Sequence, residues 1–157
     1  MMLFRVQGIP GSVAESVRSS LRSPQYGHPA HAELATGTGP CRLCLEPFTI
    51  GRDQRLLFTY QPFSDPAALP APGPVVIHRE SCRRYDALEM PAGLSTLPLV
   101  VEGYGDEGTL LARRRIEADA GAALAEVFGP ANVRYAHLRH GEAGCFVARV
   151  DRCYPCD

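Results

Sequence analysis

Two pairs of metal-binding residue types frame the middle of this 157-residue chain: Cys41-Arg42-Leu43-Cys44 and His78-Arg79-Glu80-Ser81-Cys82. Two residues between cysteines let both sulfurs face one tight turn, and tetrahedral zinc takes four Cys or His ligands at about 2.0–2.3 Å. The spacing therefore predicts a zinc site made of Cys41, Cys44, His78 and Cys82. The competing interpretation is that the cysteines are small buried hydrophobic residues and that His78 is a hydrogen-bonded core imidazole.

Four protein ligands leave no coordination position for water, so we expect a structural rather than a catalytic metal. The order of the segments, a Cys-x2-Cys turn, then a hairpin, then two more ligands, resembles treble-clef zinc modules, LIM-type domains among them. In those modules the second ligand pair lies at the first turn of a helix. Residues 81–90, which end before Pro91, fit such a helix in this chain.

Turn-bounded runs of β-branched, aromatic and alternating apolar residues predict the strands, and capping residues predict the helices. The expected strands cover residues 3–9, 55–60, 75–77, 97–104, 109–118, 133–139 and 145–150, with a helix as the alternative over 109–118. The expected helices are one capped by Ser12, one over 81–90 and one over 122–128 capped by Asp119. This pattern predicts a single α+β domain over residues 1–157, with a mostly antiparallel sheet and two or three short helices.

The last two predicted strands form a hairpin around the loop at residues 140–144. Pairing about the centre of this loop places Arg139 opposite Cys145, His137 opposite Val147 and Tyr135 opposite Arg149. The other face then carries the core residues Ala136, Leu138, Phe146, Ala148 and Val150. The polar face gathers His137, Arg139, Cys145 and Arg149, which suits an anionic ligand, with Arg42 as a helper. The alternative is a half-solvated strand whose polar residues share no site.

A second Cys-x2-Cys pair, Cys153 and Cys156, lies at the end of the sequence. Three interpretations stay open for it: a half-site that joins Cys41 and Cys44 in a four-thiolate zinc ribbon, a redox pair, or a tail whose thiols have no role. A redox pair normally needs a helix beneath its first cysteine.

Composition limits the classes of partner. The formal net charge is −1, so binding to a nucleic-acid backbone is not expected, whereas the 16 basic residues are all arginine, which suits small anions. The start has no signal-like pattern and the sequence has no run of about twenty apolar residues, so we expect no membrane span and a cytoplasmic, reducing location. Common nucleotide-binding, hydrolase and zinc-protease motifs are absent, which leaves enzymatic activity open.

Four short motifs are spread over most of the chain: Pro40 to Glu46, Gly51 to Phe63, Gly73 to His78, and the closing Arg139, Gly144, Cys145, Phe146 and Arg149. Together they resemble an uncharacterised bacterial family, domain of unknown function 1203. The resemblance implies a small bacterial cytoplasmic domain without an established activity. Two functions follow as hypotheses: a binding or interaction module with a structural zinc site, or a small enzyme or anion-binding protein that uses the C-terminal hairpin.

Overall fold

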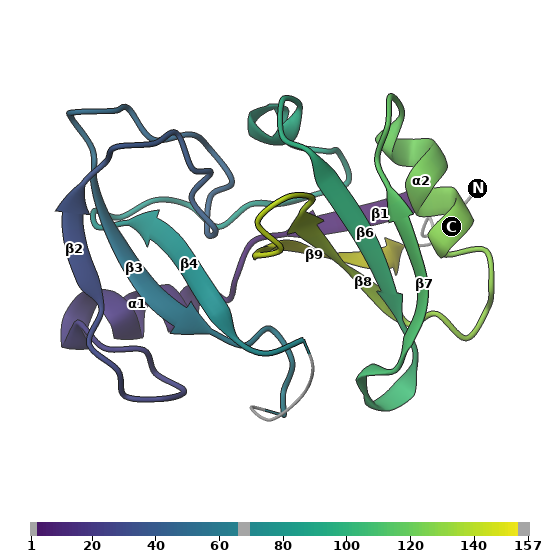
Figure 1. The fold of residues 1–157 in the computed structure, drawn as a ribbon, viewed down its shortest axis with the longest axis horizontal. Coiled ribbons are helices and arrows are strands. Elements are labelled where there is room, and N and C mark those ends of the chain that lie inside the picture. The colour runs from purple at the N-terminus through teal and green to yellow at the C-terminus, as the bar shows by residue number, and fades with distance from the viewer. Residues whose placement is uncertain (1–2, 66–69, 154–157) are drawn as a thin grey trace.

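The computed structural model describes residues 3–65 and 70–153, which form two antiparallel sheets with one α-helix beside each (Figure 1). The larger sheet has the strand order β5-β1-β9-β8-β6-β7, and the smaller has the order β2-β3-β4. Every pairing within both sheets is antiparallel. The expected α+β class with a mostly antiparallel sheet is therefore confirmed.

The strands of the larger sheet are short, and β1 from the start of the chain lies among strands from its second half. They are β1 (Leu3–Gln7), β5 (Asp86–Ala87), β6 (Leu99–Tyr104), β7 (Leu110–Arg115), β8 (Tyr135–His140) and β9 (Phe146–Cys153). The smaller sheet holds β2 (His31–Leu34), β3 (Gln54–Tyr60) and β4 (Gly73–His78). The helices are α1 (Gly11–Ser20) and α2 (Ala120–Val127), and two 3-10 turns cover Ala92–Leu94 and Asp106–Gly108. No described helix is long and apolar enough to cross a membrane.

The two helices differ in how well the sequence predicted their starts. Asp119 caps α2 as expected, since its side chain accepts a hydrogen bond from the backbone N–H of Ala122 at 3.3 Å. The predicted cap of α1 was wrong: Pro10 precedes the first helical residue, and Ser12 lies inside the helix. The carbonyl of Pro10 accepts the first backbone bonds of the helix, from Val13 at 3.1 Å and from Ala14 at 3.4 Å.

The helix expected over residues 81–90 is absent, and this prediction was wrong. The segment runs in an irregular path and contributes the two-residue strand β5, which pairs with β1 through Val6 and Ala87. Its backbone groups bond to other segments: the N–H of Tyr85 donates to Leu43 and its carbonyl accepts from Gly8, both at 2.9 Å. These tertiary bonds replace the bonds that a helix would make within itself. The likeness to treble-clef modules thus does not extend to their helix.

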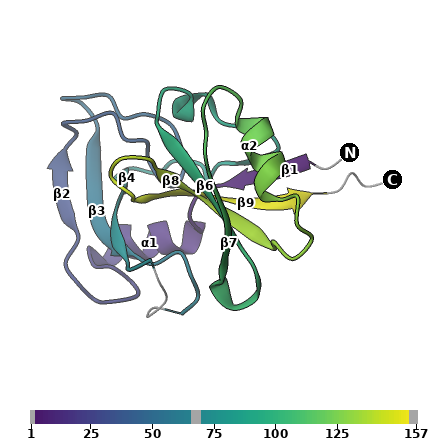
Figure 2. The same cartoon turned by 45° about the vertical axis from the view of Figure 1, so that its right-hand side comes forward.

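Each sheet builds a hydrophobic core with its helix (Figures 1 and 2). Leu124, Val127 and Phe128 pack on one face of the larger sheet, where Gly103 gives α2 room to approach. Ala14 and Val17 of α1 pack on the smaller sheet together with Phe58. Burial of these apolar surfaces is the main source of stability.

A bulge in the final hairpin changes the predicted register. The pairing shifts between Leu138 and Arg139, so two residues of β9 oppose one of β8. The predicted pairs were therefore wrong, and the observed pairs are Tyr135 with Asp151, His137 with Arg149, and Arg139 with Phe146. Phe146 consequently leaves the face where the sequence placed it, whereas Ala136, Leu138, Ala148 and Val150 join the core of the larger sheet as expected.

Candidate metal centre and C-terminal polar cluster

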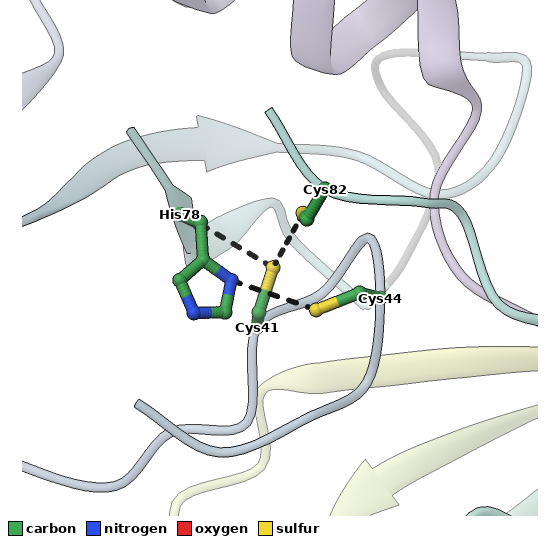
Figure 3. Close-up of side chains that lie close together, drawn as sticks. All are labelled: Cys41, Cys44, His78 and Cys82. Atoms are coloured by element: carbon green, nitrogen blue, oxygen red, sulfur yellow. Dashed lines mark hydrogen bonds between the residues drawn. The ribbon is translucent and has the colours of Figure 1, made fainter. Parts of the chain in front are cut away.

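Four side chains of the types that bind metals converge at one end of the smaller sheet (Figure 3). The ligand atoms of Cys41, Cys44, His78 and Cys82 all lie within 4.8 Å of one another. The two sulfurs of Cys41 and Cys82 are 3.9 Å apart, and the sulfur of Cys44 is 3.5 Å from Nδ1 of His78. The four residues predicted from their spacing are therefore positioned to bind a metal ion.

These separations match a tetrahedral coordination shell. With metal–sulfur bonds of about 2.3 Å and a metal–nitrogen bond of about 2.0–2.1 Å, a regular tetrahedron places two sulfurs about 3.8 Å apart and sulfur and nitrogen about 3.6 Å apart. The cysteines are free thiols, and 3.9 Å is far longer than the ~2.05 Å of a disulfide bond. Chelation therefore fits this geometry better than a disulfide.

The turn that carries the first ligand pair is held from several sides. The N–H of Cys41 donates to Glu46 at 3.0 Å, and that of Leu45 donates back to Cys41 at 2.8 Å. Leu45 takes a positive φ of 59° to close the turn. The N–H of Arg42 donates to Val76 in β4 at 2.8 Å, so the turn lies beside the strand that delivers His78. The segment between β1 and α1 closes the other side, where the N–H of Ile9 donates to Arg42 at 2.9 Å.

Polar neighbours orient the ligands. The backbone N–H of His78 donates to the Cys41 sulfur at 3.3 Å, and Arg18 donates to the Cys82 sulfur at 3.3 Å. Nε2 of His78 lies 3.6 Å from a carboxylate oxygen of Asp53, on the opposite side of the ring from the cluster. A carboxylate behind a ligating imidazole is a common second layer of metal sites because it fixes the orientation of the ring.

The hydrogen bonds within the group favour one thiolate. Bonds from the Cys44 and Cys82 thiols lower the pKa of Cys41, and the same bond to Cys41 raises the pKa of Cys44. A hydrogen bond with Cys41 also raises the pKa of His78. Cys41 is fully buried, so its negative charge depends on these neighbours. A thiolate is the form of cysteine that binds metal.

The polar residues of the final hairpin do not form one solvated face. His137 is 1% exposed and Arg139 is 7% exposed, whereas Arg149 is partly exposed and pairs with Asp151 at 3.0 Å. Cys145 lies in the turn between the strands and is partly buried. The observed strand pairing does place the side chains of His137, Arg139 and Arg149 on the same face of the hairpin, but the surroundings of these side chains differ. The structure brings Arg139 and Cys145 to one cavity, and His137 and Arg149 do not line that cavity.

His137 lies inside an aromatic cluster rather than in a polar site. The centroid of its ring is 4.8 Å from that of Phe63, 5.1 Å from Tyr104 and 5.0 Å from Phe146. Burial, together with the positive charges of Arg139 and Arg149, lowers the pKa of His137 to about 3. The imidazole is therefore neutral at physiological pH, and it adds no positive charge to the hairpin.

Arg42 connects the metal-binding turn to the final hairpin. Its side chain is 5% exposed and donates to the carbonyl of Phe146 at 2.7 Å, the carbonyl of Pro40 at 2.6 Å and the sulfur of Cys145 at 3.4 Å. Burial lowers the pKa of Arg42. Arg42 thus contacts Cys145, and the helper role expected for it stays a prediction.

A cavity of about 260 Å³ lies beside these groups, between the β8–β9 turn and the adjoining ends of β3 and β4. Its lining from the β8–β9 hairpin includes Arg139, Gly144, Cys145 and Phe146. Tyr60, Pro74 and Val75 line it from the smaller sheet. A second hollow, of about 300 Å³, adjoins Cys44 and Cys82 and links the metal cluster to the surface.

Sequence reasoning missed three residues that support these sites: Asp53, Arg18 and Glu102. Glu102 is 8% exposed, and its Oε1 lies 2.8 Å from Nε of Arg139. A carboxylate within the apolar strand β6 was a usable signal, because a buried charge needs an opposite charge nearby. No comparable signal marked Asp53 or Arg18, since neither stands out from an ordinary surface residue in the sequence.

The C-terminal cysteines are only partly described. Cys153 ends β9 and pairs with Leu3 of β1, and Cys156 lies outside the described residues. Cys41 and Cys44 are already grouped with His78 and Cys82. The four-thiolate ribbon therefore lacks the support that the Cys3His group has.

The comparisons with known proteins return one family. The model of the family described as "Protein of unknown function (DUF1203)" matches residues 38–152, a range that includes all four clustered ligands and the final hairpin. No curated protein and no solved structure matches the chain.

Proposed function

Because this chain belongs to the DUF1203 family, whose description assigns no activity, we propose its function from its own residues: a binding module held in shape by a structural zinc ion. Cys41, Cys44, His78 and Cys82 are the proposed ligands. The convergence of their four ligand atoms within 4.8 Å is the observation that carries this proposal.

The donor set favours zinc over other divalent ions. Three thiols and one imidazole are soft or borderline ligands, which suit zinc, whereas magnesium and calcium prefer oxygen. Cys3His is a common set for structural zinc, and the measured separations fit its tetrahedron. Free thiols require a reducing environment, so the proposal includes a cytoplasmic location.

Four protein ligands close the tetrahedron, which supports a structural role. The ion would join the turn at residues 41–44, the end of β4 and the irregular segment at Cys82, in addition to the backbone bonds from Arg42 to Val76 and from Tyr85 to Leu43. The free energy of ion binding would add to the free energy of unfolding, because the unfolded chain does not hold the four ligands together. The protein surface so fixed would receive a protein partner or a small anion.

Metal analysis tests this proposal. Protein purified from cells without added zinc should contain about one equivalent of zinc by mass spectrometry. Cys41→Ser and Cys82→Ser should each lose it, whereas Cys145→Ser, outside the cluster, should keep it. Replacement by cobalt should give the visible absorption of a tetrahedral thiolate site.

Two results would overturn the proposal. One is folded protein that contains no metal and takes up none. The other is an unchanged zinc content in both Cys41→Ser and Cys82→Ser, because the bound ion would then lie elsewhere.

A further inference from the structure

The cavity beside the β8–β9 turn lies between the two sheets of the fold. Figures 1 and 2 show this turn reaching from the larger sheet toward β4 of the smaller sheet. The cavity opens between them, and it is separate from the hollow that adjoins Cys44 and Cys82. None of the four clustered residues Cys41, Cys44, His78 and Cys82 lines it, so the cavity is a site distinct from that cluster.

Arg139 lines the cavity, and its guanidinium has unsatisfied hydrogen-bond donors. Its Nη1 donates to the carbonyl of Gly144 at 3.2 Å, and its Nε contacts Glu102 without a directed hydrogen bond. Its Nη2 is buried and has no hydrogen-bond partner in the described part of the chain. A buried donor without an acceptor costs stability, so the guanidinium of Arg139, a lining residue of the cavity, gains from an acceptor that comes close to it.

The charges around the cavity favour an anion. Arg42 and Arg139 are both buried, and the described contacts include one carboxylate near them, that of Glu102. The hydrogen bonds of Arg42 go to two carbonyls and a thiol, so no carboxylate balances its charge there. No Asp or Glu is among the described residues that line the cavity. The cavity lining therefore carries the positive charge of Arg139 and, among the described residues, no carboxylate.

The remaining walls are apolar and set the size of a ligand. The aromatic rings are those of Tyr60 and Phe146, whose centroids lie 5.9 Å apart, and three prolines and Val75 add aliphatic surface. The volume of about 260 Å³ is below the roughly 300–1,000 Å³ of pockets for drug-sized ligands. The ligand is therefore small, with an apolar body.

We propose that this cavity binds a small organic carboxylate with an aromatic or branched aliphatic body, whose carboxylate pairs with the guanidinium of Arg139. The body of the ligand packs against Tyr60 and Phe146. This site names the ligand class of the proposed binding module and in that sense rests on the proposed function, but its residues are not metal ligands. Arg42 positions the turn that closes the site.

Nuclear magnetic resonance titration of the full chain tests the site with two probes of equal shape. Benzoate should give saturable, one-to-one shifts in the amide signals of Gly144, Cys145 and Phe146 and in the Nε signal of Arg139. Benzamide, which lacks the charge, should bind at least about tenfold more weakly, because charge-assisted hydrogen bonds are roughly twice as strong as neutral ones. Isobutyrate serves as the branched aliphatic probe.

Variants locate the binding. Ala71 is exposed at the rim, so Ala71→Trp should fill the cavity and abolish the benzoate shifts without disturbing the core. Ala131→Trp, at an exposed turn outside the described lining, is the matched control and should bind as the parent does. The double variant Glu102→Gln with Arg139→Gln removes both charges together, which avoids a lone buried charge, and should also lose binding.

Three results would overturn the inference. They are no saturable shift with benzoate or isobutyrate at tens of millimolar, equal affinity for benzamide, or benzoate shifts that persist in Ala71→Trp. Zinc content, measured on the same samples, separates this test from that of the metal. Metal-free protein that binds benzoate would refute the zinc proposal alone. Zinc-loaded protein that binds neither benzoate nor isobutyrate would refute the ligand site alone.

Discussion

The side chain of Arg42 donates a hydrogen bond from Nε to the carbonyl of Phe146 at 2.7 Å, across 104 positions of sequence. Arg42 lies between the two cysteines of the metal-binding turn, and Phe146 begins the last strand of the larger sheet. This bond joins the metal cluster to the final hairpin. It also places a buried guanidinium behind Cys145, at the edge of the cavity.

Arg42→Met should destabilise the protein by about 2–3 kcal/mol, because the carbonyls of Phe146 and Pro40 lose their buried donor. Methionine keeps much of the aliphatic stem, so the loss reports on the hydrogen bonds rather than on packing. Urea unfolding followed by circular dichroism measures the change. Arg115→Met, at an exposed position of β7, is the control and should stay within about 0.5 kcal/mol of the parent. Equal stability of the two variants would show that the Arg42 bonds contribute little.

Removal of the metal should lower the melting temperature by at least about 10 °C, since each kcal/mol corresponds to roughly 2–4 °C in a chain of this size. The physical reason is that the ion binds the folded chain and not the unfolded one. Differential scanning calorimetry with and without a strong chelator measures the shift. Cys41→Ser protein should melt at a lower temperature and be insensitive to the chelator. A chelator effect of the same size in that variant would point to another metal site.

Gly8→Ala should weaken both the fold and metal retention. A Cβ atom at position 8 would overlap the backbone carbonyl of Leu43, which belongs to the metal-binding turn, and backbone cannot swing aside as a side chain can. Gly11→Ala is the matched control, because open space surrounds a Cβ there and alanine is the better helix former by about 1 kcal/mol. Urea unfolding and zinc content should both fall for Gly8→Ala, and neither should fall for Gly11→Ala. A Gly8→Ala variant that keeps its zinc would show that the turn can shift without opening the cluster.

The convergence of Cys41, Cys44, His78 and Cys82 was predictable because the signal is local within each pair, and a shared metal site would require the two pairs to meet. The helix expected over residues 81–90 failed for the opposite reason. Its residues favour a helix, but Tyr85 bonds to Leu43 and Gly8, and Ala87 pairs with Val6. Those partners lie far away in sequence, so no local pattern reveals them.

The final hairpin shows a second limit of sequence reasoning. Alternation correctly grouped His137 with Arg139, yet the bulge beside Leu138 moved Phe146 onto their face. A bulge adds one residue to one strand and leaves the alternation of each strand nearly intact, so the pattern does not disclose it. The burial of this face was equally hidden, because it depends on the neighbouring aromatic residues Phe63 and Tyr104.

His137 should make the protein less stable as the pH falls below neutral. Burial first, and then the charges of Arg139 and Arg149, lower the pKa of His137 to about 3 in the folded chain, whereas an unfolded histidine titrates near 6.5. Between about pH 3 and pH 6.5, His137 is therefore protonated in the unfolded chain and neutral in the folded chain. The stability contributed by neutral His137 is therefore complete above about pH 6.5 and is lost progressively as the pH falls toward 3.

Urea unfolding at pH 7 and pH 5 measures this contribution by comparison with His137→Gln, which cannot take up the proton. The parent should lose on the order of 2 kcal/mol more than the variant over this interval, because one pKa unit corresponds to about 1.4 kcal/mol. Protonation of the metal ligands affects both proteins alike and cancels in the difference. Parallel losses in the two proteins would mean that folded His137 takes up its proton near the usual pH, and that the aromatic cluster opens to admit the charge.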